Sequence, residues 1–220
     1  MPRKPYVWVT WLTKLLAGEH RCEWALWFKA NNRGYEQIID PNFDLDAWTA
    51  EHDRQVIQRA EFLRSNGWKV SVEDSNKFTL VGEFAVLGGK ADLFATKEHP
   101  NLYVTHPGRH AYMVEDVKTG KERESDKWQV RIYQYAYPRV IKSLHGLKII
   151  GVLVYSAGRQ VEVEPMTIIE IGKFAALMQM AAADLEPPRT PSRAECASCN
   201  IKACPDRDNS PELEGATKDF

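Results

Sequence analysis

Residues 111–120 read AYMVEDVKTG, and this stretch decides the fold that we expect for the chain. Its valines and tyrosine are typical of a strand, and residues two apart on a strand point to the same face. Asp116 and Lys118 therefore project together at the strand end, whereas Glu115 points to the opposite face. Of the 30 Asp and Glu residues in the sequence, only Asp116 has a lysine two positions later.

A second carboxylate lies upstream, in GGKAD at residues 88–92, within the strand that we expect over 84–94. Carboxylates on adjacent strands can bind Mg²⁺ or Mn²⁺ through oxygen, and a neighbouring lysine can orient an attacking water. Asp92, Asp116 and Lys118 therefore form a set that suits phosphodiester hydrolysis. For the Asp116–Lys118 pair by itself, a simple salt bridge at an exposed strand end is the alternative.

Hydrophobic periodicity and turn residues predict a single α/β domain. We expect helices over 8–17, 22–30, from Asp44 or Asp46 to Gly67, over 125–144, and from the capping box Thr167-x-x-Glu170 to Pro187. We expect strands over 69–73, 77–81, 84–94, 111–117, 149–155 and 160–163. Pro138 should kink or split the fourth helix. This order predicts a mixed sheet flanked by helices.

Composition places the chain among globular proteins, with 44% hydrophobic and 27% charged residues and no apolar run of the roughly 20 residues that cross a membrane. Thr10, Thr13 and Lys14 interrupt any signal-peptide core, so we expect a cytoplasmic protein without membrane association. The net charge of -1 gives no global indication of nucleic acid. Basic residues are concentrated between Lys118 and Lys148, where a solvated helix face is the alternative to a nucleic-acid contact.

The four cysteines form a separate pattern: Cys22 lies near the start, and Cys196, Cys199 and Cys204 lie close together near the end. In a reducing compartment these thiols would stay available to a metal. The tight C-terminal spacing argues against four unrelated thiols, and the expected location argues against two disulfides. We therefore expect one shared metal ion or cluster.

A shared metal site would join the N-terminal and C-terminal parts of the chain, and this sets the domain boundaries that we expect. We expect a single domain over residues 1–204, in which residues 1–43 and 186–204 form a small cysteine-clasped subdomain. Residues 205–220 are rich in Asp, Glu, Pro and Gly, and we expect them to form an acidic disordered tail.

The order of these features resembles the RecB-like branch of the PD-(D/E)XK nucleases. The order is a cysteine, a helix with His52, a Gly-x-x-Asp strand, an Asp-x-Lys-Thr-Gly strand, a Gln-x-x-x-Tyr helix and three cysteines. It is most similar to the four-cysteine iron–sulfur members of that branch, such as the CRISPR-associated adaptation exonuclease. Each motif is loose, but the ordered set is specific and extends from Cys22 to Cys204.

The resemblance implies roles for the residues at matching positions. The implied ligands of a catalytic Mg²⁺ or Mn²⁺ are His52, Asp92, Asp116 and the carbonyl of Val117. Lys118 would position and activate the water, and Gln129 and Tyr133 would brace the active site and contact DNA. The implied ligands of a [4Fe–4S] cluster, with zinc as the alternative metal, are Cys22, Cys196, Cys199 and Cys204. Glu115 is the alternative to Asp116, and Glu73 and Glu83 lie near an acidic position of some relatives without being assigned a role.

These roles imply a metal-dependent DNA nuclease, a single-stranded DNA exonuclease with possible endonuclease activity. Its substrate would be single-stranded DNA or DNA with single-stranded ends. Its setting would be prespacer processing in CRISPR spacer acquisition, an antiviral defence, with CRISPR integrase proteins as partners, or DNA repair. The alternatives are a non-catalytic DNA-binding subunit and a zinc-stapled structural or partner-binding protein. We expect a DNA tunnel lined by aromatic and basic residues, with Trp128, Arg131, Tyr133, Tyr135 and Tyr137 as candidates.

Overall fold

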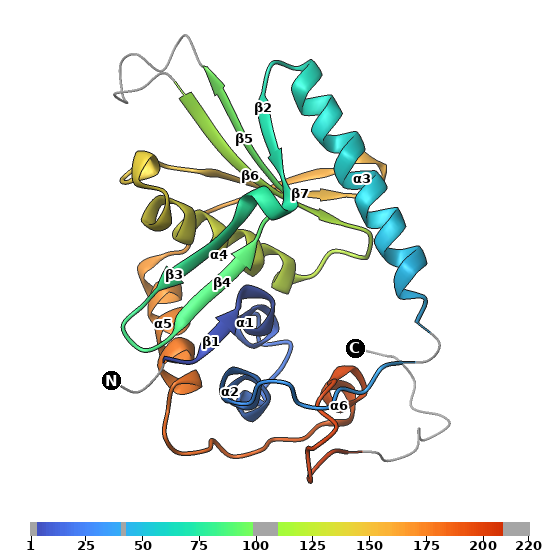
Figure 1. Ribbon diagram of the computed structural model, residues 1–220, viewed down its shortest axis with the longest axis vertical. Helices are drawn as coiled ribbons and strands as arrows, with labels where there is room; N and C mark the ends of the chain where they lie inside the picture. The colour runs from blue at the N-terminus through green and yellow to red at the C-terminus, as the bar shows by residue number, and fades with distance from the viewer. Residues whose placement is uncertain (1–3, 41–42, 99–109, 209–220) are drawn as a thin grey trace.

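The computed structural model describes residues 4–40, 43–98 and 110–208 (Figure 1). The helices are α1 (Val9–Leu16), α2 (Glu23–Asn31), α3 (Leu45–Ser65), α4 (Glu124–Val140), α5 (Ile168–Ala181) and α6 (Arg193–Ser198). The strands are β1 (Tyr6–Trp8), β2 (Lys69–Val72), β3 (Lys77–Val81), β4 (Val86–Lys90), β5 (Leu93–Glu98), β6 (His110–Lys118), β7 (Ile150–Tyr155) and β8 (Gln160–Val163). Short 3₁₀ turns are η1 (Glu73–Asn76), η3 (Lys142–Leu144) and η4 (Ser156–Gly158). The predicted class, mixed sheets flanked by helices in an α/β fold, is confirmed.

The larger sheet has five strands in the order β2-β5-β6-β7-β8. Strands β6 and β7 are parallel and are connected through α4, whereas the other neighbours are antiparallel. Leu93 of β5 pairs with Glu115 of β6. Asp92 and Asp116 follow at neighbouring positions of adjacent strands, so the register brings the two carboxylates to one end of the sheet.

The smaller sheet has the order β1-β4-β3 and corrects one expectation. The strand expected over 84–94 is two strands, because the chain leaves the small sheet after β4 and enters the large sheet at β5. At this break the side chain of Asn76 donates to the carbonyls of Ala91 and Asp92, at 3.1 and 3.4 Å. These bonds satisfy carbonyl groups that have turned away from a strand partner.

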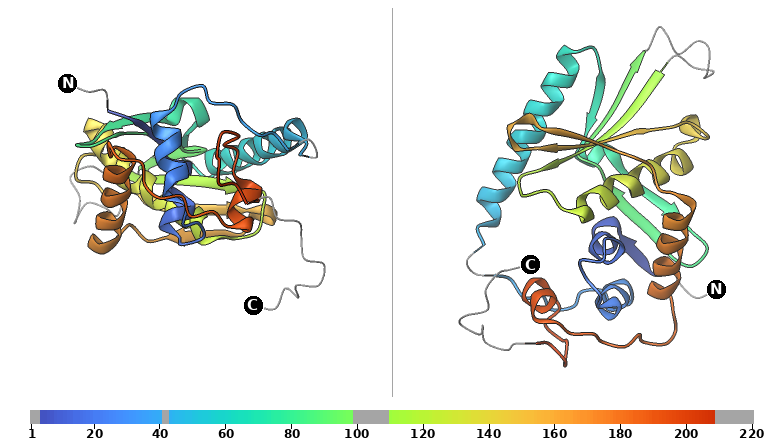
Figure 2. Two further views of the ribbon diagram at one scale, coloured as in Figure 1. Left: turned by 90° about the horizontal axis from the view of Figure 1, so that it is seen from below. Right: turned by 180° about the vertical axis from the view of Figure 1, so that it is seen from behind.

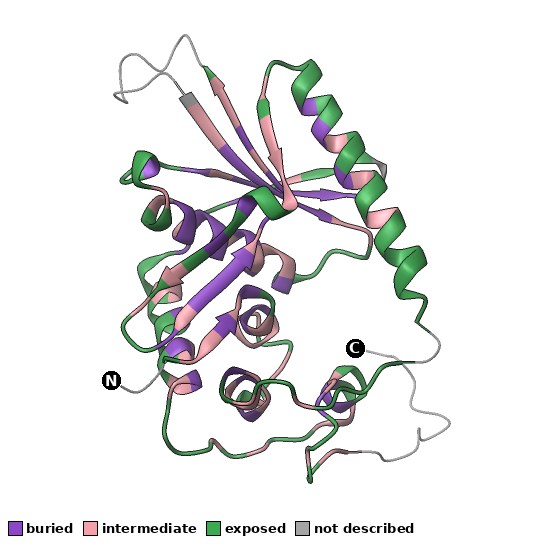
Figure 3. Ribbon diagram, in the orientation of Figure 1, coloured by how far each residue is buried: buried purple, intermediate pink, exposed green. Residues whose placement is uncertain are grey.

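Helices cover both faces of the large sheet. On one face Val56, Ala60 and Leu63 of α3 pack in a core cluster with residues of β5, β6 and β7, and the other face is covered by α4. Figure 3 shows these buried positions along the strands and on one side of α3. Helix α4 lies so close to β7 that a Cβ at Gly151 would come 2.5 Å from Val130, which explains a glycine inside a buried strand.

Helix ends follow their local signals. The capping box of Thr167 and Glu170 is present at α5, and the Asp44 side chain accepts from the amide of Ala47 at the start of α3. The helix expected over 125–144 ends at Val140 and is followed by η3, so Pro138 remains inside its last turn. Two elements were missed: β1, whose last residue, Trp8, we expected to begin the first helix, and the six-residue α6.

Helices α2 and α6, from the N- and C-terminal parts of the chain, lie on the side away from the large sheet (Figure 2). The amide of Ile38 donates to the carbonyl of Asn200 at 2.9 Å, and Gln37 forms an isolated bridge with Ile201. Most of the tail expected over 205–220 lies outside the described residues. None of the helices in the described ranges has the length and apolar character that a membrane crossing requires.

Candidate active site at the end of β6

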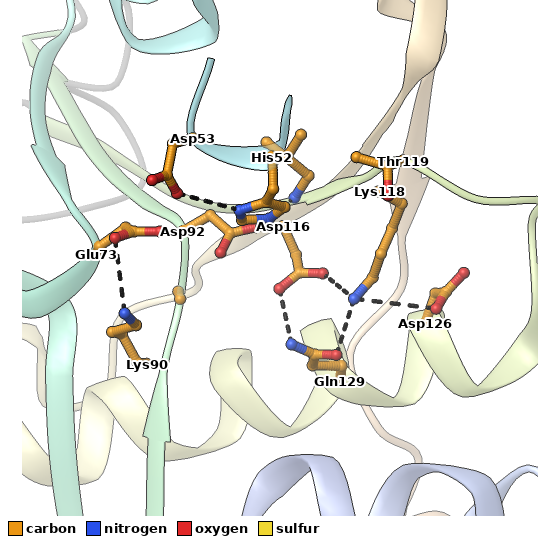
Figure 4. A network of polar contacts seen from close by, with 12 residues as sticks. His52, Asp53, Glu73, Lys90, Asp92, Asp116, Lys118, Thr119, Asp126 and Gln129 are labelled. Carbon is orange, nitrogen blue, oxygen red and sulfur yellow. Dashed lines mark hydrogen bonds and ion pairs between the residues drawn. The ribbon is translucent and has the colours of Figure 1, made fainter. Parts of the chain in front are cut away.

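A cavity of about 390 Å³ opens where β6 ends, between α3 and α4. Six of the lining residues are ones to which we assigned a site role from the sequence. The others are side chains that flank them. The lining residues are Thr10, Trp48, His52, Asp92, Asp116, Val117, Lys118, Thr119, Gly120, Lys121, Arg123, Asp126 and Gln129. Figure 4 shows the polar side chains that converge here from α3, the start of β5, the end of β6 and α4.

Asp116 is the most buried carboxylate of the cavity, with 1% of its surface exposed. Its Oδ1 accepts from Gln129 Nε2 at 2.8 Å, and its Oδ2 lies 2.6 Å from Lys118 Nζ. Oδ2 is buried, and the Lys118 ammonium is its close charged partner. Lys118 Nζ also donates to Gln129 Oε1 at 3.0 Å. Gln129 therefore links the aspartate and the lysine.

Asp92, His52 and Glu73 form a second cluster beside Asp116. One ligand atom from each lies within 4.8 Å of the other two, a spacing at which they could share one cation. Asp92 Oδ2 is 3.4 Å from His52 Nε2 and accepts from the amide of Val117 at 2.6 Å. The structure therefore brings His52, Asp92 and the amide of Val117 together, and it places Glu73 beside His52 and Asp92. The resemblance implied the carbonyl of Val117 as a ligand.

Glu73 is the site residue that sequence reasoning left unassigned. It begins η1 directly after β2, and its φ of 43° is the only positive φ of a non-glycine residue in the described ranges. A glutamate in the left-handed region costs on the order of 1–3 kcal/mol, and such strain is concentrated at functional sites. Its amide is held by the carbonyl of Asp92 at 2.9 Å. An acidic residue at a strand end was visible in the sequence, but its proximity to Asp92 was not.

Glu115 lies on the opposite face of β6 from Asp116, as strand alternation predicts. It is fully buried and accepts two hydrogen bonds from Arg59 of α3, both of 2.7 Å. This bidentate pair holds α3 against β6, and α3 is the helix that contains His52. Glu115 is thus committed to an internal ion pair and does not line the cavity.

Tyr133 is a buried support of the site. Its ring is 1% exposed, and its hydroxyl donates to the carbonyl of Lys90 at 2.8 Å and accepts from Gln129 Nε2 at 2.9 Å. The hydroxyl therefore connects α4 with the end of β4, next to the break that carries Asp92. This position fits the bracing part of the role that the resemblance implies.

Burial and mutual charge change the titration of the site. Loss of hydration raises the pKa of Asp116 to about 7, against the lowering effect of Lys118 and with a further raising effect of Asp92. Burial alone would lower the pKa of Lys118, but Asp116 raises it above its usual value. The hydrogen bond to Asp92 raises the pKa of His52. At neutral pH Lys118 therefore keeps its proton, whereas protons compete with any cation for Asp116 and His52.

We expect the effect of Mn²⁺ on stability to increase as pH rises through about 7. Because folding raises the pKa of Asp116 from 3.8 to about 7, the metal-free protein should lose stability as pH rises through this window. Cation binding needs the deprotonated groups, so affinity should rise by about tenfold per pH unit for each proton displaced. Thermal unfolding at pH 5.5 to 8.5, with EDTA or Mn²⁺, measures both trends. A Mn²⁺ shift that is constant over this range would contradict them.

The four cysteines line one smaller cavity of about 180 Å³ near the two chain ends. All four are free thiols, and burial is the largest effect that raises the pKa of Cys204, with the neighbouring cysteines contributing. Cys196 lies on α6, Cys199 follows its end, and Cys22 precedes α2. The structure thus brings together the cysteines that the sequence separates.

Positive charge surrounds these thiols, since Lys14, Lys29 and Arg189 line the same cavity. Burial lowers the pKa of Lys29, while Cys199 raises it. The one carboxylate of the cavity, Glu195, accepts from the amides of Arg21 and Cys22 at 2.8 and 3.0 Å. These bonds already join the two halves of the cysteine set across 173 positions of the chain.

Known proteins give little further information. No protein-family model matches the chain, and no curated protein matches it. Among solved structures, the crystal structure of SSO0001 is similar over 90% of this chain and 84% of that chain, with 18% sequence identity and a TM-score of 0.48. A likeness at this level defines neither a family nor an activity.

The aromatic residues that we expected to line a DNA tunnel belong mainly to the core. Trp128, Tyr133 and Tyr137 are at most 4% exposed, and Tyr137 donates to the carbonyl of Asn76. Tyr135 packs edge-on against a ring of α5, away from the cavity at the end of β6. The exposed aromatic side chain that does line this cavity is Trp48 of α3.

Proposed function

We propose that this protein is a metal-dependent DNA nuclease. The observation that carries the proposal is the cavity at the end of β6, in which two carboxylates from adjacent strands meet a lysine and a histidine. Glu73 stands beside them and adds a third carboxylate. This combination of oxygen ligands, imidazole and ammonium suits hydrolysis of a phosphodiester.

The residues present fit a divalent cation of the Mg²⁺ or Mn²⁺ type. The ligand atoms of His52, Glu73 and Asp92 have the spacing of a shared ion, and the buried Oδ2 of Asp116 is a further carboxylate oxygen at the same cavity. Hard cations of this class prefer such carboxylate oxygens. A cation held by these residues would supply Lewis-acid polarisation of the scissile phosphate.

Lys118 has an electrostatic role in this proposal. Its raised pKa keeps it protonated at neutral pH, so it does not act as a general base. An ammonium group has three N–H donors. Beyond the contacts with Asp116 and Gln129, a remaining donor can hold the attacking water or a phosphate oxygen. The charge of Lys118 would then stabilise the negative charge that develops in the transition state.

The substrate that we propose is single-stranded DNA, or DNA with single-stranded ends, cut as an exonuclease with possible endonuclease activity. Lys121 and Arg123 line the cavity beside the carboxylates and provide cationic contacts for the phosphates on either side of the cut. Trimming of DNA ends before integration in CRISPR spacer acquisition, with integrase proteins as partners, or repair of DNA, would use this activity in the cytoplasm.

For the cysteine cavity we propose a [4Fe–4S] cluster. Tetrahedral Zn–S bonds of about 2.3 Å would place thiolate sulfurs about 3.8 Å apart. Among the described residues no three cysteine sulfurs meet the 4.8 Å spacing that His52, Glu73 and Asp92 meet, although all four cysteines line one cavity. A cluster with an iron at each of four corners holds its thiolates further apart than a single ion does. The spacing therefore favours the cluster over zinc.

Purified protein should degrade end-labelled single-stranded DNA with Mn²⁺ and should not do so with EDTA. The reason is that the carboxylates and the DNA phosphate are both negatively charged. Without a bound cation they repel one another. Denaturing gels over a time course measure the products and show whether cutting starts at an end. Circular DNA without ends separates exonuclease from endonuclease cutting.

The same assay distinguishes the alternatives. Metal-independent binding of the DNA without cleavage would favour a non-catalytic DNA-binding subunit and overturn the nuclease. Failure both to bind and to cleave would favour a structural or partner-binding protein. Zinc without acid-labile sulfide in anaerobically purified protein would overturn the cluster but leave the nuclease intact.

A further inference from the structure

Trp48 is an exposed aromatic residue held in a fixed position at the mouth of the candidate active site. Its side chain lines the cavity, yet 44% of the residue surface is exposed. Its ring stacks on the His52 imidazole, with centroids 5.4 Å apart and planes 18° apart. Its indole N–H donates to Thr119 Oγ1 at 3.2 Å. The indole therefore connects α3 with the end of β6, directly beside a candidate metal ligand.

Local helix structure explains only part of this arrangement. Phe43 precedes the N-cap residue Asp44, and its ring lies 6.3 Å from that of Trp48, the fourth residue of α3. This is the geometry of a hydrophobic staple, which fixes the direction in which the chain enters a helix. An aliphatic residue at position 48 would serve the staple as well. The staple does not account for the stack on His52, the bond to Thr119 or the exposed area.

On the basis of the nuclease function proposed above, we propose that Trp48 is a stacking platform for one unpaired base next to the scissile phosphate. The stack on His52 and the bond to Thr119 fix the indole before a strand binds, so little freedom is lost on binding. Cationic Lys121 and Arg123 line the same cavity and can hold the adjoining phosphates. An aromatic face beside a basic groove is the arrangement that binds single strands independently of sequence.

The platform selects against paired DNA. A base within a duplex is stacked on both sides and its ring faces are covered, so it cannot lie on the indole unless it leaves the stack. A single strand has bases whose faces are available. Trp48 therefore makes the site specific for unpaired nucleotides, because it contacts the ring face of the base. The hydrogen-bonding edge of the base plays no part in this contact.

Binding of a fluorescent oligothymidylate, measured by anisotropy in EDTA, tests the platform separately from cleavage. Trp48→Leu keeps the apolar group of the staple and removes the aromatic face, so its affinity should fall by about tenfold. Trp48→Phe should restore most of the affinity. The matched control is Phe62→Ala, since Phe62 is 53% exposed on the same helix, about 21 Å further along at 1.5 Å per residue. It should bind as the wild type does.

Oligonucleotides with one abasic nucleotide, moved along the strand, locate the stacked base. The wild type should lose affinity at one position, and Trp48→Leu should show no such position. The platform is overturned if folded Trp48→Leu binds like the wild type, if no abasic position matters, or if the wild type does not bind the oligonucleotide. Binding that depends on Trp48 without any cleavage would overturn the nuclease and support the platform. Cleavage by the wild type with unchanged binding by Trp48→Leu would do the opposite.

Discussion

Asp116→Asn and Glu73→Gln should each lower the rate of DNA cleavage by about 1,000-fold or more. Each change removes a charged oxygen ligand from the candidate cation site but nearly preserves the shape of the side chain. Asp116 provides a buried carboxylate oxygen beside Lys118, and Glu73 completes the cluster with His52 and Asp92. Rates measured with saturating Mn²⁺ on end-labelled single strands check this expectation.

Two features of the chain make this experiment specific. Asp74 adjoins Glu73 but its side chain is 94% exposed, so Asp74→Asn is the matched control and should cleave normally. Asp116→Asn removes the closest charged partner of Lys118 and should reduce stability, whereas Glu73→Gln removes a partly exposed carboxylate. Thermal unfolding of both variants separates loss of chemistry from loss of structure. Normal cleavage by folded Glu73→Gln would exclude Glu73 from the cation site.

Replacing any of the four cysteines by serine should remove the cluster and destabilise the fold by several kcal/mol. A cross-link between Cys22 and the region of Cys196 closes a loop of more than 170 residues, for which loop-closure entropy gives about 5 kcal/mol. Iron and acid-labile sulfide after anaerobic purification, together with thermal unfolding, measure the two effects. The matched control is Ser198→Ala, because Ser198 lines the same cavity between two of the cysteines. It should retain iron, sulfide and stability.

Loss of the cluster that joins Cys22 to the three C-terminal cysteines should also reduce cleavage, although no cysteine lines the active-site cavity. Thr10 of α1 lines both cavities, and Glu19, just after α1, accepts from the amide of Ser125 at the start of α4. Helix α4 carries Gln129, which holds Asp116 and Lys118. Movement of α1 would therefore disturb the carboxylate through α4. Full activity in a cysteine variant that has lost its iron would show that the two sites are independent.

Sequence patterns predicted the elements whose signals are local. The capping box at Thr167, the N-cap at Asp44 and the short strands β3 and β8 all follow from residues within a few positions of one another. Alternation along β6 likewise assigned Asp116 and Glu115 to opposite faces, as the structure has them. Such signals depend only on the backbone geometry of one helix or strand. They can therefore be found in the sequence of that helix or strand alone.

Elements without a local signal were missed or joined wrongly. The stretch 84–94 has the composition of one strand, and the break at Ala91 depends on the Asn76 side chain, fifteen positions away. The three-residue β1 pairs with β4 across the chain, and nothing within Tyr6–Trp8 distinguishes it from the start of a helix. Aromatic residues were misassigned for the same reason, because burial depends on which elements pack against them.

By itself, the sequence determined which groups are the candidates for chemistry: Asp92, Asp116 and Lys118 at expected strand ends, and a divided set of four cysteines. Only the tertiary structure decided that Glu73 joins His52 and Asp92, that Trp48 stands at the mouth of the cavity, and that all four cysteines line one cavity. Periodicity fixes the face of an element on which a side chain lies. Distances between elements depend on sheet register and helix packing, which are set by contacts between residues far apart in the chain.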